Sequence, residues 1–70
     1  MNLLISKKAA EAFNLNRRIV VRDLADASQI WCEYRDRSGL GVSDIGNGGN
    51  VLNDSGKRIA KISYNGRIWE

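Results

Sequence analysis

The side chains of this 70-residue chain that are best suited to bind a ligand are its eleven lysines and arginines, which outnumber the eight carboxylates. Seven of the eleven are arginines, whose planar guanidinium group forms paired hydrogen bonds with phosphates and carboxylates. The formal net charge of +3 favours an anionic partner, such as nucleic acid or the acidic face of a protein. The same sign excludes a mimic of DNA, which needs a strongly negative surface. A solvated surface on a soluble protein would explain the charges equally well.

Catalysis and metal binding have little support among the residue types. The chain has no histidine and one cysteine, Cys32, so it lacks a nucleophile–histidine pair, a zinc-ligand pattern and an internal disulfide. Among the carboxylates, Asp44 alone has no local structural role in the predicted elements. A chain of this size also has little room for a catalytic cleft. We therefore expect a protein that is not an enzyme and that uses no metal or cofactor.

A glycine-rich segment over residues 46–50 is the second candidate for binding chemistry. Consecutive glycine amides can form a nest for an anion. The segment lacks the Gly-Lys-Ser/Thr end of a P-loop, and it also lacks the flanking strand and helix of a dinucleotide site. The sequence therefore predicts a pliable polar loop, in which Asn47 and Asn50 would contact a partner.

The first half of the chain predicts two strands and two helices. Apolar residues 1–5 indicate a strand, and the β-branched run within 17–22 indicates a second, buried one. Ser6 is suited to cap a short helix over 7–13, which the asparagines that follow would end. A longer helix over 24–37 would begin after Asp23 and end at Gly39, with an apolar stripe of Leu24, Ala27, Ile30, Trp31 and Tyr34.

The last third of the chain predicts a three-stranded meander. Residues 42–45 would form a brief strand, and the meander would begin at residues 51–52 after the glycine-rich loop. The turn Asn53-Asp54-Ser55-Gly56 then leads to a strand over 57–64.

The Asn65-Gly66 pair predicts a two-residue type I′ turn at the end of that strand. Such a turn would place Ile62 opposite Trp69 and Lys61 opposite Glu70, with the last two as a cross-strand ion pair. Trp69 would then face the helix, and the predicted core cluster is Trp31, Tyr34, Ile62 and Trp69.

Together these elements predict one α+β domain over residues 1–70, a small and mostly antiparallel sheet with a C-terminal three-stranded meander, packed against one main helix. No apolar run approaches the roughly 20 residues of a membrane span, and the first apolar run is too short for a signal peptide. A single cysteine fits a reducing compartment. We expect a cytoplasmic protein with no membrane partner.

In this fold the cations would flank the second strand and line the meander beside the glycine-rich loop. The predicted partner-binding residues are Arg17, Arg18, Asn47, Asn50, Lys57, Arg58, Lys61 and Arg67. Cations on a sheet beside aromatic rings can hold single-stranded nucleic acid and stack its bases. Because the predicted register assigns Tyr64 and Trp69 to the core, the sequence favours a cationic patch over a stacking surface.

Two segments, Asp-Leu-Ala-Asp-Ala-Ser-Gln-Ile from Asp23 and Asp-Ser-Gly-Lys-Arg-Ile-Ala-Lys-Ile-Ser-Tyr-Asn-Gly-Arg-Ile-Trp up to Trp69, resemble small proteins of phages and mobile elements. Their layout resembles that of a small type I-F anti-CRISPR inhibitor, in which a strand, a helix opening with a Leu-x-x-Ala-type segment and a meander precede a C-terminal tryptophan. The resemblance implies a non-enzymatic inhibitor that masks a surface of a CRISPR effector complex in the host cytoplasm. The glycine-rich stretch over 39–50 departs from that layout.

Three functions stay open on the sequence. The first is an inhibitor or adaptor that masks a protein partner, such as a CRISPR effector subunit. The second is a small basic module that binds nucleic acid. The third is a subunit of a homo-oligomer that completes its core by self-association. Affinity that falls steeply with salt would indicate phosphate contacts, and the mass in solution would test self-association.

Overall fold

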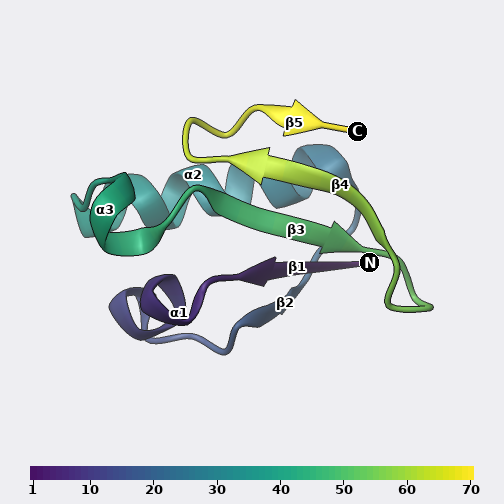
Figure 1. Ribbon diagram of the computed structural model, residues 1–70, viewed down its shortest axis with the longest axis horizontal. Coiled ribbons are helices and arrows are strands. Elements are labelled where there is room, and N and C mark those ends of the chain that lie inside the picture. Colours follow the sequence, from purple (N-terminus) through teal and green to yellow (C-terminus); the bar gives the residue numbers. More distant parts are fainter.

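Five strands form one antiparallel sheet in the order β2-β1-β3-β4-β5 in a computed structural model that describes residues 1–70 (Figure 1). The strands are β1 (Asn2–Ile5), β2 (Arg18–Val20), β3 (Gly48–Leu52), β4 (Arg58–Ser63) and β5 (Ile68–Trp69). The helices are α1 (Lys7–Phe13), α2 (Leu24–Ser38) and α3 (Val42–Ile45). This confirms the predicted α+β class, with its antiparallel sheet and one main helix.

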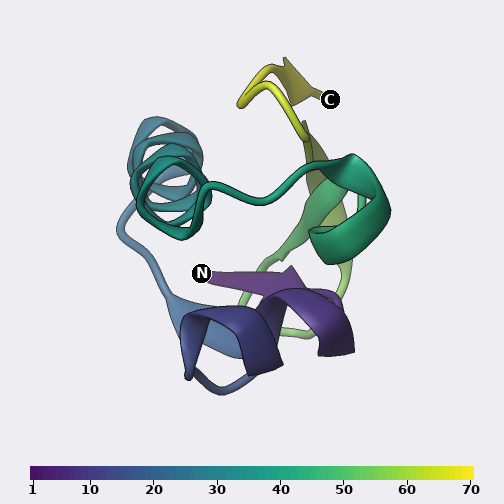
Figure 2. The same cartoon turned by 90° about the vertical axis from the view of Figure 1, so that its left-hand side faces the viewer.

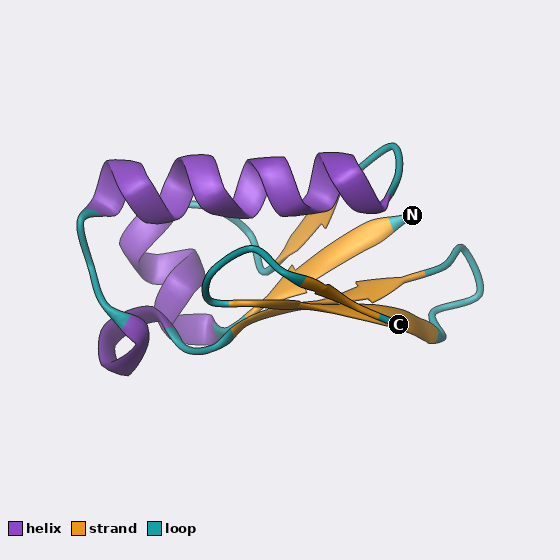
Figure 3. Ribbon diagram, turned by 90° about the horizontal axis from the view of Figure 1, so that it is seen from above, coloured by secondary structure: helices purple, strands orange, loops and turns teal.

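Helix α2 lies along one face of the sheet, and no helix covers the opposite face (Figure 3). Viewed along α2, the sheet curls so that the helix lies inside the curve, while α1 and α3 gather at one end (Figure 2). The outer face of the sheet therefore has no helical layer over it.

Helix α1 spans the predicted residues, and α2 begins as predicted and ends one residue later, at Ser38. The Ser6 hydroxyl accepts a hydrogen bond from the Ala9 N–H (3.0 Å), and α1 ends at Asn14 in the left-handed conformation. Asp23 accepts from the Asp26 N–H (2.8 Å), and Gly39 ends α2 with φ of 67°. These contacts satisfy backbone groups that a helix end leaves unpaired.

The core lies between α2 and the inner face of the sheet. Trp31 is only 1% exposed, and its ring packs edge-on against Phe13 with 5.7 Å between centroids. Its indole N–H donates to the Tyr64 carbonyl (2.9 Å), so the buried polar atom is satisfied. The sheet contributes alternate buried residues to the same cluster, namely Leu3, Ile5, Val51, Ala60 and Ile62.

The glycine-rich segment differs from the prediction. Residues 42–45 form the short helix α3 instead of a strand, and residues 48–50 begin the central strand β3 instead of a loop. Glycine is required here for close approach. A Cβ on Gly49 would lie 2.8 Å from the Leu4 carbonyl oxygen, and one on Gly48, where φ is +113°, would overlap the Ile62 carbonyl.

The second strand also differs from the prediction, because β2 lies at the edge of the sheet and is not buried. Val20 is 81% exposed, Ile19 is half-buried, and Val21, which follows the strand, is in the core. The β-branched run therefore predicted the strand correctly, but it did not predict that the strand lies at the edge of the sheet.

The turn between β4 and β5 contains three residues, so the predicted type I′ turn is wrong. The Ser63 N–H donates to the Arg67 carbonyl and the Gly66 N–H to the Ser63 carbonyl, both at 2.9 Å. Of Asn65 and Gly66, only Gly66 has a positive φ (88°). A three-residue hairpin loop commonly ends with such a left-handed glycine.

This turn shifts the register of β5 by one residue. Lys61 pairs with Trp69 and Ile62 with Ile68, so the predicted pairing of Lys61 with Glu70 does not form. A shift of one residue turns every side chain of the strand to the opposite face. Trp69 consequently lies on the outer face, 50% exposed, and the predicted packing of Trp69 with Trp31 and Ile62 is wrong.

Candidate binding surface on the open sheet face

The register of the five strands places five side chains in one line across the open face. Leu4 pairs with Arg18 on one side and Asn50 on the other, Asn50 pairs with Lys61, and Lys61 with Trp69. The inner-face chain neighbours of Leu4, Asn50 and Lys61 are buried in the core, so these three point outward. Directly paired residues share a face of the sheet, so Arg18 and Trp69 point outward with Leu4 and Lys61. Neighbouring strands are about 4.8 Å apart, so the line spans about 19 Å. We call it the outer row: Arg18, Leu4, Asn50, Lys61 and Trp69.

The strands of the sheet carry positive but no negative side chains, and the nearest carboxylate to Trp69 in sequence, Glu70, directly follows β5. No strand residue is aspartate or glutamate, whereas three are cations, Arg18, Arg58 and Lys61. Each of the three is exposed, and none forms an ion pair within 4.0 Å. Exposed and unpaired cations are available to the carboxylates or phosphates of a partner.

Trp69 ends the outer row at β5. The Arg67 guanidinium lies 4.3 Å from the centroid of the indole ring, within the range of a cation–π contact. Beside the ring is a shallow depression of about 220 Å³, lined by Arg58, Ile59, Ala60, Lys61, Trp69 and Glu70. The structure therefore brings a half-exposed aromatic ring together with three cations at this edge.

Five of the eight predicted partner-binding residues lie on or beside the outer row. Arg18, Asn50 and Lys61 belong to it, while Arg58 and Arg67 border Trp69. Asn50 lies within β3 and not in the predicted loop.

The other three predicted residues lie elsewhere. The Arg17 Nε donates to the Ile5 carbonyl (3.0 Å), which gives that side chain a structural role at the end of β1. Asn47 lies between α3 and β3, and Lys57 lies in the turn before β4, where its N–H donates to the Asn53 side chain.

Sequence reasoning missed Leu4 and Trp69. The Asn-Gly pair is compatible with a two-residue and a three-residue loop, and Ile68 and Trp69, the two residues of the following strand, are both apolar. Hydrophobic alternation therefore did not distinguish the two registers. One usable signal was Ser63, whose hydroxyl accepts from the Arg67 N–H (3.1 Å) and closes the longer loop.

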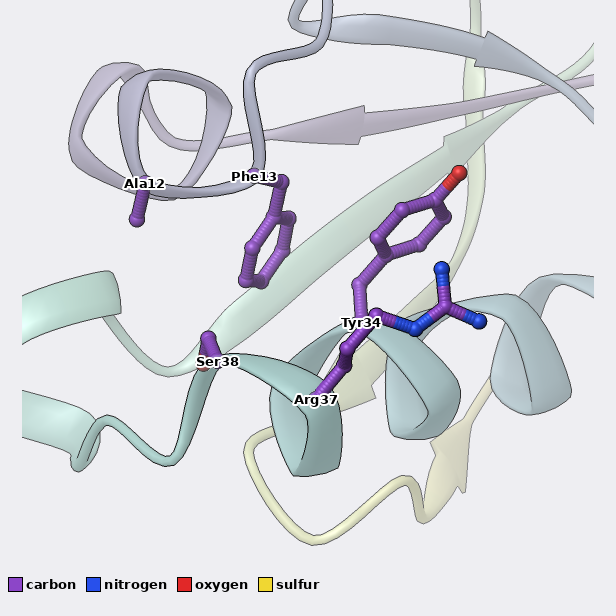
Figure 4. Close-up of a pocket in the computed structure, with 5 residues that line it drawn as sticks. All are labelled: Ala12, Phe13, Tyr34, Arg37 and Ser38. Carbon is purple, nitrogen blue, oxygen red and sulfur yellow. The ribbon is translucent and has the colours of Figure 1, made fainter.

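A second depression, of about 180 Å³, lies between α1 and α2 (Figure 4). The Phe13 and Tyr34 rings stack with 5.5 Å between centroids, and the Arg37 guanidinium lies 5.5 Å from the Tyr34 ring. Ala12 and Ser38 complete the lining. These contacts join the two helices and provide no pair of groups for acid–base chemistry.

Arg35 is the one cation withdrawn from the surface. Its Nη1 donates to the Tyr64 carbonyl (2.8 Å), and its Nη2 lies 2.8 Å from the Asp36 carboxylate. The hydrogen bond that the Arg35 guanidinium donates to the Asp36 carboxylate raises the pKa of the Arg35 side chain above its usual value. Arg35 therefore stays charged and ties α2 to the turn before β5.

The remaining candidate groups have structural explanations. Asp44 lies in the first turn of α3, where a carboxylate suits the helix dipole. Cys32 is a half-buried free thiol on α2. No group of three or more histidine, cysteine, aspartate or glutamate side chains could hold a metal ion, and no helix is long and apolar enough to cross a membrane.

The comparisons with known proteins add no assignment to this geometry. No protein-family model, curated protein or solved structure matches the chain.

Proposed function

We propose that this protein is a non-enzymatic binding protein that acts in the cytoplasm of its host cell and contacts an anionic macromolecule with the outer row. The observation that supports the proposal is the presence of exposed, unpaired cations and a half-exposed tryptophan on a sheet face without a strand carboxylate. Such a face increases the rate of encounter with a negative partner and can form charge-assisted hydrogen bonds with it.

The masking inhibitor suggested by the resemblance is one form of this function. Its partner would be an acidic protein face, for example on a subunit of a CRISPR effector complex. A symmetric homodimer through the outer row has less support, because a two-fold contact presents the same patch from both copies and would bring like charges together.

A capture experiment tests the proposal. Tagged protein is used to retain partners from a host-cell lysate, and wild type is compared with the Arg18→Glu/Lys61→Glu variant. The matched control is Lys7→Glu/Lys8→Glu, which makes the same charge change at two exposed positions of α1. We expect wild type and control to retain a partner that the outer-row variant loses.

Thermal unfolding of all three proteins checks that the fold is intact, since exposed charges contribute little to stability. A partner retained equally by the outer-row variant would show that the basic face only keeps the protein in solution. The binding surface would then have to be sought on the acidic side of α2, at Asp26, Glu33 and Asp36.

A further inference from the structure

We infer that the anionic macromolecule bound by the outer row is single-stranded nucleic acid, with a base stacked on Trp69. The inference rests on the proposed function and adds the chemical class of the partner. It depends on the register of β5, which places the ring on the open face beside Lys61.

The spacing along the outer row suits a strand that lies across the sheet. Lys61 is one strand away from Trp69, and Arg18 is three strands beyond Lys61, which is about 14 Å. A base on Trp69 would place its own phosphate near Lys61 or Arg67, and a phosphate farther along the chain near Arg18. Between the cations lies the half-buried Asn50, whose amide can donate to or accept from a base edge or a sugar.

The Trp69 side chain favours bases over a purely acidic partner. Arg67 lies against the ring, and half of the side chain stays exposed for a second planar group. Every base has a π-face, so stacking on an aromatic ring holds nucleic acid without requiring a particular sequence. Acidic protein side chains would pair with Lys61 and Arg18 but have no comparable use for the ring.

A single strand fits the surface better than a duplex. Proteins read the major groove by inserting a helix or a two-stranded ribbon, and stacking on a tryptophan requires an unpaired base. The longest helix, α2, has three carboxylates and two arginines within its fifteen residues, so its side chains are net negative and poorly suited to the phosphates that line a groove. The open sheet face therefore fits bases that are free of pairing.

Fluorescence anisotropy tests the inference with a labelled oligothymidine of about 12 nucleotides, a length within the roughly 4–16 nucleotides that one OB-fold covers. The same sequence annealed to its complement is the duplex probe. We expect wild type to bind the single strand more tightly than the duplex. Trp69→Ala should weaken binding of the single strand by about 5- to 150-fold, the range for one stacked base. Trp69→Phe should restore part of that loss.

Salt dependence isolates the phosphate contacts. For the Arg18→Gln/Lys61→Gln variant, the slope of log affinity against log salt should become shallower by about 1.4, since each phosphate contact to a single strand contributes about 0.7. The control variant Lys7→Gln/Lys8→Gln should retain the wild-type affinity and slope.

The outcomes separate this inference from the proposed function. Equal binding of duplex and single strand, or an unchanged affinity in Trp69→Ala, would overturn the inference. The inference would also be overturned if wild type bound no oligonucleotide at low salt but captured a protein from nuclease-treated lysate through Arg18 and Lys61. The proposed function would stand in that case. Capture that is independent of Arg18 and Lys61 would instead overturn the proposed function.

Discussion

The two sides of this molecule differ in how their charges are used. On the helix side, Asp26 accepts a hydrogen bond from the Arg22 N–H (2.9 Å) and Asp36 is paired with Arg35 at 2.8 Å. On the open sheet face, Arg18 and Lys61 have no such partner. Asp26 and Asp36 therefore satisfy the chain's own structure, whereas Arg18 and Lys61 remain available to another molecule.

The two tryptophans show the same difference in burial. Trp31 on α2 is 1% exposed and bonded to the Tyr64 carbonyl, while Trp69 on β5 is 50% exposed. One ring stabilises the fold, and the other extends the candidate binding surface. Substitutions at matched positions on the two sides can test this division.

The largest effect is expected from Trp31→Ala, which should lower the free energy of unfolding by about 3–5 kcal/mol because it removes a fully buried ring. The matched Trp69→Ala should cost no more than about 1 kcal/mol, since half of that side chain is already in water. Urea denaturation of both variants measures the difference. Equal losses would mean that Trp69 is part of the core after all.

Substitutions at two glycines in turns should have the next largest effect. Gly66 and Gly56 have similar positive φ angles, 88° and 84°, and a Cβ would overlap the Cys32 Sγ only at Gly66. Gly56→Ala should cost about 1–2 kcal/mol for the left-handed backbone alone. Gly66→Ala should cost more, because α2 holds the turn against Cys32.

Adding Cys32→Ala to Gly66→Ala isolates that contact. The double variant should recover most of the excess cost, as a double-mutant cycle of unfolding free energies would measure. Failure to recover it would show that Cys32 does not limit the space at the turn.

The smallest expected effect on the free energy of unfolding comes from removing one charge on each side of the molecule, Asp26 on α2 and Lys61 on the sheet face. Asp26→Ala should lower the free energy of unfolding by about 1 kcal/mol, because it removes the hydrogen bond to the Arg22 N–H and a carboxylate at the start of α2. Lys61→Gln should change it by less than about 0.5 kcal/mol. Chemical denaturation of the two variants is the measurement, and a larger loss in Lys61→Gln would contradict the division of charges.

The candidate site was only partly predictable. The residue types of Arg18, Asn50 and Lys61 led to their prediction as partner-binding residues. Their alignment depends on β1, which lies between β2 and β3 and joins segments that are far apart in sequence. Chain order alone does not determine such an arrangement, because each pairing also depends on which strands compete for the same edge.

The sequence by itself determined the two longer helices, α1 and α2, since their signals are local. Ser6, Asp23 and Gly39 each satisfy backbone groups three or four residues away, and those bonds need no distant partner. The α+β class follows from the same local patterns of capping and periodicity.

Only the tertiary structure decided the role of the glycines in β3 and the register of β5. Gly48 and Gly49 lie in the central strand β3 because the neighbouring backbones at Ile62 and Leu4 approach too closely for a side chain at these positions. The turn after β4 is held from α2, where Trp31 and Arg35 donate to the Tyr64 carbonyl and Ser28 donates to the Gly66 carbonyl. These contacts span about thirty residues or more of sequence, so no local pattern encodes them, and they turn Trp69 outward.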